Sequence, residues 1–370
     1  MSNKINIAYV CSTLEQTGPT SQLYNIISGL NKNIYHPIII TLSPEPHNSL
    51  KEKFKYIEII RLSFNNKFAF FSGRKSFLKV LNEKNIDLVH SQGIRPDLLC
   101  MMSVPKDKWI STLRNIPFHD YIQRYGKLRG IPMSVIHLLC LRYAKNVAVV
   151  SLEQEYKLKN YLNNIVFIPN GVDTIFYSHK NISTNITDKL KKELNKKEND
   201  IYLIYTGILS PRKNIEFLLD LSLNLDNNIK LLIVGTGELL GKIEKHAAII
   251  KNKAILIGQT NDVRPYLAIS DIFILASKSE GLPNSALEAY SMGLPLLLSD
   301  IPPHEYISNL IPKNTMLINI QNKKIFEEIN GYIYGLLKNK DNENMKKDTV
   351  KYFSSQVNSQ KYQNLYKNLI

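Results

Sequence analysis

DIFILASKSEGLPNSALEAYSMGLPLLLSD, residues 271–300, contains two short apolar runs separated by a polar loop and a helical segment. Each apolar run has the length of a buried strand. The helix is expected to begin near Asn284 or Ser285, since both are good N-cap residues, and to end at Gly293, before Pro295. Two strands joined through a helix make the βαβ unit of a parallel sheet.

The same alternation of strand-like and helix-like segments runs along most of the chain. The polar, Lys-rich segment 178–200 interrupts it and is the best candidate for a domain connection. Because alternating strands and helices form parallel sheets, the pattern predicts an α/β protein with two doubly wound domains. We expect an N-terminal domain at 1–177, a C-terminal domain at 178–350, and a closing helix at 351–370 that returns toward the N-terminal domain.

The composition is that of a globular protein with a basic surface. Of 370 residues, 44% are hydrophobic and 21% charged, and the formal net charge is +15. This charge attracts anions such as nucleic acid, anionic lipid or phosphorylated small molecules, but a Lys- and Asn-rich composition with solvated charges explains it equally well. No apolar run is long enough to span a bilayer and no signal sequence is recognisable, so a cytoplasmic location is expected. The three cysteines, Cys11, Cys100 and Cys140, are expected to be free buried thiols.

Two carboxylates, Glu280 and Glu288, lie on either side of the predicted helix start. Gly281 and Pro283 prevent a continuous helix, so Glu280 can fold back over the free backbone N–H groups of the first turn, which bind anions. Carboxylates accept hydrogen bonds from hydroxyls, so the pair suits a ligand with sugar rings at both ends and phosphate between them. Taken singly, Glu280 is more simply a capping or loop acid, and Glu288 a surface helix glutamate.

The string SEGLPNSALEAYSMGLPLLLSD (279–300) resembles the Glu-x7-Glu signature of retaining glycosyltransferases of the GT4 family, whose commonest members make bacterial cell-surface polysaccharides. The resemblance spans nearly the whole chain and is weakest over 45–85 and 305–370. It implies the GT-B fold, in which two Rossmann-like domains face each other across a cleft. The other strings that resemble family landmarks, in the family's order, are NIAYVCSTLEQTGPTSQLYNII, VVSLEQEYKL, IPNGVD, YTGILSPRKNIEFLL, LLIVGTGE and ILIGQTNDV.

The resemblance implies a role for each residue of the opening string. Glu280 would contact hydroxyls of the transferred sugar, and Glu288 would hold the ribose of the nucleotide. The backbone around Gly281, Leu282 and Pro283 would approach the diphosphate. The implied donor is a nucleoside-diphosphate sugar, with UDP as the expected nucleotide.

Arg212 and Lys213 follow a strand that ends at Gly207, and Asn214 is the expected cap of the next helix. By resemblance the two cations neutralise the donor diphosphate. Fixed cations stabilise the charge that grows on a departing phosphate, so such a site needs no metal or other cofactor, and no DxD-type or His-rich cluster demands one. The simpler alternative is a solvated pair at a helix entry.

Candidate residues of the N-terminal domain are fewer. Gly18 lies in the first strand–helix loop, which by resemblance faces the sugar phosphates and the acceptor, although many relatives have two glycines where this chain has Gly18-Pro19. Many relatives also carry a histidine where this chain has Arg114, which could bind phosphate or acceptor instead. His119 is a rival for that role and is more simply a loop histidine, while His90 is interpreted as structural.

The basic segment 121–145 mixes five Lys and Arg residues with apolar ones. This composition is compatible with a helix that rests on an anionic membrane, and also with a core-packed helix that has a solvated basic edge.

The sequence therefore predicts a retaining, metal-independent glycosyltransferase. It would move a hexose or N-acetylhexosamine to a saccharide acceptor, expected to be lipid-linked, in the synthesis of a capsule, lipopolysaccharide or exopolysaccharide. The expected partners are the nucleotide sugar, the acceptor and an anionic membrane surface, but no nucleic acid. The alternatives are a nucleotide-sugar epimerase of similar two-domain fold and a non-catalytic basic protein that binds anions.

Overall fold

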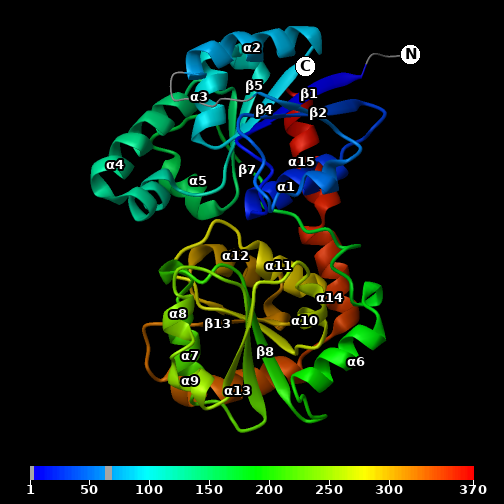
Figure 1. The fold of residues 1–370 in the computed structure, drawn as a ribbon, viewed down its shortest axis with the longest axis vertical. Coiled ribbons are helices and arrows are strands. Elements are labelled where there is room, and N and C mark those ends of the chain that lie inside the picture. The colour runs from blue at the N-terminus through cyan, green and yellow to red at the C-terminus, as the bar shows by residue number, and fades with distance from the viewer. Residues whose placement is uncertain (1–3, 63–68) are drawn as a thin grey trace. The chain divides into compact units, whose positions relative to one another are not determined.

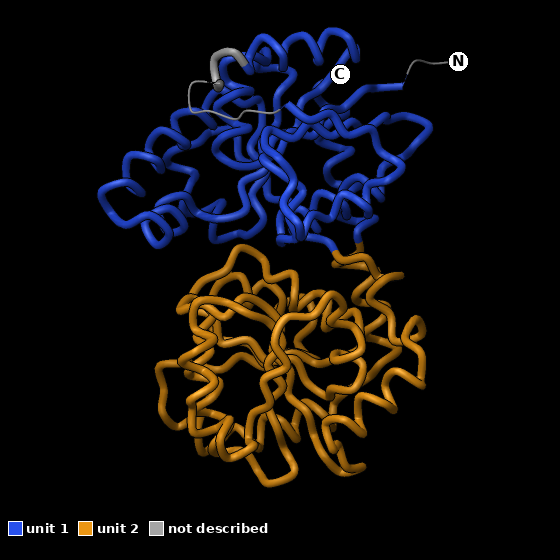
Figure 2. The backbone as a smooth tube through the Cα atoms, viewed as in Figure 1, with its two compact units in different colours: residues 1–171, 355–370 blue, residues 172–354 orange. Residues whose placement is uncertain are grey.

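The computed structural model describes residues 4–62 and 69–370 and divides into two compact units. Unit 1 comprises Met1–Gly171 and Ser355–Ile370, and unit 2 comprises Val172–Ser354 (Figure 2). Each unit has its own parallel sheet with helices around it (Figure 1). The predicted α/β class with two doubly wound sheets is thus confirmed.

The sheet of unit 1 has seven strands in the order β3-β2-β1-β4-β5-β6-β7. All of their pairings are parallel. The strands are β1 (Ile5–Cys11), β2 (Tyr35–Thr41), β3 (Glu58–Arg61), β4 (Leu88–Gln92), β5 (Trp109–Leu113), β6 (Asn146–Val149) and β7 (Ile165–Phe167). The helices are α1 (Gly18–Ser28), α2 (Ala69–Glu83), α3 (Ile94–Ser103), α4 (Pro117–Leu141), α5 (Leu152–Leu158) and α15 (Ser355–Lys367).

Alternate side chains of β1 enter two different apolar cores, because successive residues of a strand point to opposite faces. Ala8 and Val10 pack in the core that includes Leu99 of α3. Ile7 and Tyr9 pack in the other core, which contains residues of α1 and α15. Both faces of the sheet are therefore covered, as a parallel sheet requires.

The C-terminal helix α15 packs against α1 within unit 1. The phenols of Tyr366 and Tyr9 lie 3.1 Å apart, and Ser359 Oγ donates to Ile26 O at 2.7 Å. A Cβ at Gly29 would lie 2.6 Å from Ser359 Cβ, so a glycine is needed for this close approach. The chain thus returns to unit 1 after it has formed unit 2.

The sheet of unit 2 has six parallel strands in the order β10-β9-β8-β11-β12-β13. The strands are β8 (Ile201–Thr206), β9 (Ile229–Val234), β10 (Ala254–Gly258), β11 (Ile272–Leu275), β12 (Leu296–Ser299) and β13 (Thr315–Ile318). The helices are α6 (Thr184–Glu193), α7 (Ile215–Ser222), α8 (Leu240–Ile243), α9 (Ala247–Ile250), α10 (Arg264–Ala268), α11 (Asn284–Ser291), α12 (Pro302–Leu310), α13 (Ile325–Lys338) and α14 (Asn342–Asp348).

The strand order reverses direction between β8 and β11, which are neighbours in the sheet. In open parallel sheets, ligands bind outside the carboxyl ends of the strands at such a reversal. The loops that follow β8 and β11 are the ones that carry Arg212, Lys213 and Glu280. The fold of unit 2 therefore brings these separate parts of the sequence to one position.

The three cysteines are free and buried. Across the described ranges, no helix is both long and apolar enough to cross a bilayer.

Candidate functional site

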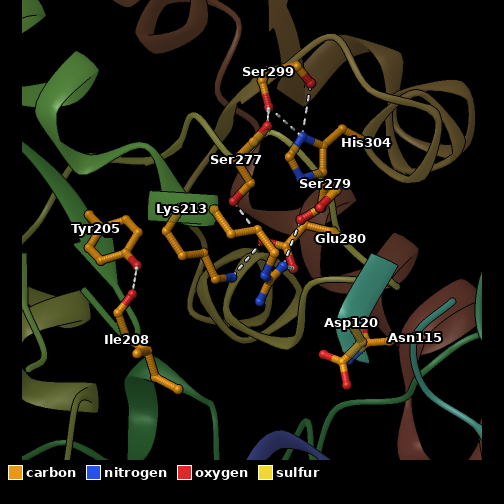
Figure 3. Close-up of polar contacts among 11 residues, drawn as sticks. Asn115, Asp120, Tyr205, Ile208, Lys213, Ser277, Ser279, Glu280, Ser299 and His304 are labelled. Carbon is orange, nitrogen blue, oxygen red and sulfur yellow. Dashed lines mark hydrogen bonds and ion pairs between the residues drawn. The ribbon is translucent and has the colours of Figure 1, made fainter. Parts of the chain in front are cut away.

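Glu280 forms ion pairs with both cations of the neighbouring loop (Figure 3). Its Oε1 accepts hydrogen bonds from Lys213 Nζ at 2.5 Å and from Ser277 Oγ at 2.6 Å. Its Oε2 accepts a hydrogen bond from Arg212 Nη1 at 2.8 Å. The Glu280 side chain is 6% exposed, against 12% for Lys213 and 31% for Arg212. The acid is thus enclosed by the cations, and Arg212 lies nearest to solvent.

These contacts fix the charge of Glu280. Burial alone would raise the pKa of its carboxyl, but the charges of Lys213 and Arg212 and the hydrogen bonds from Lys213 and Ser277 lower it to about 2. The carboxylate is therefore ionised at neutral pH. Two cations and one anion leave the cluster with a net positive charge, which suits the binding of phosphate.

Backbone contacts join the two loops that carry the cluster. Lys278 N donates to Arg212 O at 2.9 Å, and Arg212 Nη1 donates to Ser279 O at 2.6 Å. The loop after β8 also passes very close to the loop after β9, since a Cβ at Gly235 would lie 1.8 Å from Gly207 O. Gly235 has a φ of +146°, so a side chain there would be strained as well as obstructed. The cations are consequently held on a loop with little room to move.

The starts of α7 and α11 differ in detail from the sequence expectation. Asn214 is the N-cap residue of α7, as predicted, but it is left-handed (φ 57°) and its side chain makes no capping hydrogen bond. Helix α11 begins at Asn284, within the range that the sequence predicts, but its N-cap residue is Pro283 rather than Asn284 or Ser285. The fixed φ of proline is compatible with this position directly before a helix.

Glu288 lies on α11, half-buried, and interacts with Tyr177. Burial raises the pKa of the Tyr177 phenol, and the charge of Glu288 and a hydrogen bond to it raise the pKa further. Ser291 Oγ donates to Tyr177 O at 2.7 Å and so ties the same residue to α11. Tyr177 is thus a neighbour of Glu288 that the sequence did not indicate. Gly281, Leu282 and Pro283 are buried in the turn before the helix.

Behind Glu280 lies a second group of side chains that the sequence did not single out. His304 Nδ1 lies 2.8 Å from Ser299 O, and Ser299 Oγ donates to Ser277 O at 2.7 Å (Figure 3). Burial lowers the pKa of His304 to about 4, so its ring is neutral at pH 7. These bonds run from α12 through the end of β12 to Ser277, which itself contacts Glu280. His304 is therefore buried and is linked to Glu280 through the hydrogen bonds of Ser299 and Ser277.

In unit 1, Arg114 follows β5, and among the described residues no carboxylate forms an ion pair with it. Its Nη1 donates to Asn170 Oδ1 at 2.8 Å, whereas Nε and Nη2 are buried without a hydrogen-bond partner. Burial lowers the pKa of this guanidinium, and the groups that act on it electrostatically are the phenols of Tyr362 and Tyr366. Arg114 is therefore a partly buried cation, and two of its nitrogens lack a hydrogen-bond partner among the residues that the structure describes.

The other residues of unit 1 that the sequence analysis considered are His90, His119 and Gly18, and they lie in different surroundings. His90 is buried, with Nδ1 2.7 Å from Tyr366 Oη and Nε2 2.7 Å from Thr112 Oγ1, and burial and the charge of Arg114 lower its pKa to about 3. His119 is exposed in the first turn of α4. Gly18 is exposed and is the first residue of α1 rather than part of the preceding strand–helix loop, where the sequence analysis expected it.

Among the residues that the structure describes, no group of three or more His, Cys, Asp or Glu side chains could hold a metal ion. The cations that the structure places beside Glu280 are Arg212 and Lys213.

Comparison with known proteins gives matches over nearly the whole chain. The family model described as glycosyl transferases group 1 matches residues 186–353, and the model of glycosyltransferase family 4 matches residues 17–176. An O-antigen biosynthesis glycosyltransferase of Escherichia coli, WclY, is 24% identical, and the match covers 99% of each chain. A second Escherichia coli protein, UDP-Gal:alpha-D-GlcNAc-diphosphoundecaprenol alpha-1,3-galactosyltransferase, is 28% identical over 61% of each chain.

Solved structures share the fold. The Anabaena protein HepE, crystallised in complex with UDP and glucose, superposes with a TM-score of 0.78 at 14% identity. That match covers 98% of this chain and 99% of the other.

Proposed function

We propose that the protein transfers a hexose or N-acetylhexosamine from a UDP-sugar to a lipid-linked saccharide, with retention of the anomeric configuration. The chain belongs to the glycosyltransferases of group 1 and family 4, which supports this proposal. The enzyme class excludes the epimerase and the non-catalytic anion-binding protein considered as alternatives. Its relatives make O-antigen and other surface polysaccharides, so the product is proposed to be a capsule, lipopolysaccharide or exopolysaccharide unit.

The observation that carries the donor proposal is the enclosed cluster of Glu280, Arg212 and Lys213. When the bond between the anomeric carbon and UDP breaks, negative charge grows on the β-phosphate. Cations fixed in a loop stabilise that charge more in the transition state than in the ground state, which accelerates the reaction. Arg212 is proposed to bind two phosphate oxygens and Lys213 to act as a point charge.

Glu280 is proposed to hold the sugar through its Oε2. A carboxylate offers about four acceptor positions. Lys213 and Ser277 use both positions on Oε1, while Arg212 uses one on Oε2. The remaining position can accept a hydrogen bond from a hydroxyl of the transferred sugar. In this arrangement Glu280 orients both the cations and the sugar.

The rest of the donor would extend along α11. Glu288, a neighbour of Tyr177, is proposed to accept hydrogen bonds from the ribose hydroxyls. The backbone of Gly281, Leu282 and Pro283 and the strand end at Gly207 are proposed to lie along the diphosphate. This proposal is supported by the position of residues 281–283 between the two acids, and by that of Gly207 at the start of the loop that carries Arg212 and Lys213.

Unit 1 is proposed to bind the acceptor. Arg114 is its anion-binding residue, because two of its buried nitrogens have no hydrogen-bond partner. His119, exposed on α4, and Gly18, at the start of α1, are proposed to lie along the acceptor chain. In the transfer, the acceptor oxygen bonds to the anomeric carbon on the face that UDP leaves, and its proton passes to the departing phosphate oxygen. No metal is proposed to take part, and we propose that the reaction occurs on the cytoplasmic side of the membrane.

The test is a panel of UDP-, GDP-, ADP- and dTDP-sugars incubated with wild type and with Glu288→Ala in the presence of a chelator. We expect release of UDP alone, with KM for the UDP-sugar raised in the variant because ribose contacts are lost. Transfer to a synthetic lipid-linked saccharide, with the anomer assigned by NMR, checks acceptor and retention. Absence of binding to every nucleotide would remove the proposal, and activity lost to the chelator would remove its metal-independent part.

A further inference from the structure

Helix α4 of unit 1 has an exposed apolar face. Leu128 is 94% exposed, and five more large apolar residues after it are between 43% and 61% exposed. Figure 1 shows α4 at one edge of unit 1, beyond α3 and α5. The α4 outer face consists of Leu128, Ile131, Val135, Ile136 and Leu139 of the helix, together with Tyr143, which lies two residues beyond the helix end.

The spacing of these residues places them on one side of the helix. Steps of three or four residues separate Leu128, Ile131, Val135 and Leu139, which is the spacing of a single helix face. Contiguous exposed apolar surface of this kind marks an interaction site rather than scattered surface residues. The α4 outer face is thus built to meet an apolar environment.

The opposite side of α4 is held firmly in unit 1. His137 Nε2 lies 2.8 Å from Asp97 Oδ2 on α3, and Tyr121 Oη lies 2.8 Å from His137 Nδ1. Asp97 Oδ1 in turn accepts hydrogen bonds from Ser91 Oγ and Ser111 Oγ of the sheet. This buried network anchors the inner side, so the core does not take up the outer face.

The helix is also folded on itself by two glycines. Gly126 has a φ of +73°, which interrupts the helix and reverses its course. A Cβ at Gly130 would lie 2.6 Å from Ile122 Cα, so the segments before and after the interruption touch there. The outer face is consequently displayed on a compact helical pair.

The charged residues around the α4 outer face indicate which partner this face binds. The segment 121–145 contains no Asp or Glu. Its five cations are exposed, and Lys127 and Arg129 flank Leu128 directly. An apolar helix face bordered by cations binds the interface of an anionic membrane, where apolar side chains enter the acyl region and cations meet lipid phosphates.

We propose that the α4 outer face docks the protein on anionic lipid bilayers. A second copy of the chain is disfavoured as the occupant, because a pair of α4 outer faces would bring their cations together. The link between this surface and a lipid-linked acceptor rests on the proposed function, but the binding itself does not. A failure of membrane binding is therefore distinguishable from a failure of the proposed enzymatic function.

The experiment is co-sedimentation of the full chain with vesicles of phosphatidylcholine alone or with phosphatidylglycerol added. Wild type is expected to bind the anionic vesicles, and less so at 1 M salt, because the Debye length then falls to about 3 Å. The double variant Leu128→Gln/Leu139→Gln is expected to lose binding by about tenfold or more, since each removes apolar surface that would enter the bilayer. Lys127→Gln/Arg129→Gln is expected to lose about fivefold per charge.

Ile186→Gln is the matched control. Ile186 is 50% exposed, as Leu139 is, and lies on the Lys-rich helix α6 of unit 2. Its binding to vesicles is expected to equal that of wild type, and all variants are expected to release UDP at the wild-type rate. Equal binding of wild type and Leu128→Gln/Leu139→Gln overturns the proposal. So does equal binding to neutral vesicles, or a dimer in light scattering that the same double variant dissociates.

Discussion

Unit 1 and unit 2 both have partly buried cationic side chains after a central strand, but the cations of unit 2 have an anionic partner and the cation of unit 1 does not. In unit 2, Arg212 and Lys213 share the carboxylate of Glu280. In unit 1, Arg114 has a neutral amide as its partner and two buried nitrogens without one. Burying a charge is costly unless it is paired, so the difference separates charges that are preorganised within the fold from one that is left to a ligand.

Glu280→Ala breaks the paired side of this comparison and is expected to have the largest effect. The substitution removes the proposed sugar contact and leaves Lys213, which is 12% exposed, without its anion. We expect kcat to fall by about 10³-fold, and the free energy of unfolding to fall by about 3 kcal/mol, because a buried ion pair is broken. Steady-state kinetics and urea unfolding measure the two effects. Near-wild-type kcat in a folded variant would contradict the proposed role.

Lys213→Ala removes a cation but keeps the pair of Arg212 and Glu280. We expect kcat to fall by about 10²-fold with a smaller change in KM, because the lost charge acts mainly on the departing phosphate. Lys242→Ala is the control, since Lys242 forms an exposed ion pair with Glu216 on the surface of unit 2. A rise in KM with kcat unchanged would show that Lys213 only binds the donor.

The pH dependence of stability sharpens the same comparison. The folded pKa of Glu280 is about 2 and its ordinary value is 4.5, so the ionised form stabilises the fold. The sign of the shift means that this stability is complete above pH 5 and is lost as the pH falls from about 5 toward 2, by about 3 kcal/mol. Glu280→Gln cannot ionise, so its deficit relative to wild type should shrink over that window. Urea unfolding at pH 7, 5 and 3 measures the deficit, and a constant deficit would contradict the pairing.

The local sequence pattern was enough to predict that Glu280 lies in a loop between a strand and a helix of unit 2. Strand ends, a helix start and the Gly-Leu-Pro turn lie within a few residues of Glu280, so periodicity and turn chemistry locate it. The order of the strands then brings the loops of β8 and β11 together. Whether these residues carry out the proposed roles stays a prediction.

Residues that act from far along the chain could not be found in this way. Tyr177 precedes Glu288 by more than a hundred residues, and the His304 contacts depend on how α12 meets the end of β12. On α4, apolar residues occur on both sides of the helix, so periodicity alone left a membrane helix and a core-packed helix equally open. The exposure of Leu128 and the burial of His137 distinguish the two sides.

Arg114→Met tests the cation of unit 1 that has no anionic partner. It is expected to change the free energy of unfolding least, and to raise rather than lower it. Methionine fills the space without a buried charge, so the free energy of unfolding should stay constant or rise by about 1 kcal/mol. Because the proposal makes Arg114 an anion-binding residue, kcat/KM for the acceptor should fall by about tenfold or more, with UDP release in the absence of acceptor unchanged. Thermal unfolding and kinetics with varied acceptor measure both. Destabilisation similar to that of Glu280→Ala would mean that Asn170 and the neighbouring phenols already satisfy this cation, and that its charge belongs to the fold rather than to a ligand.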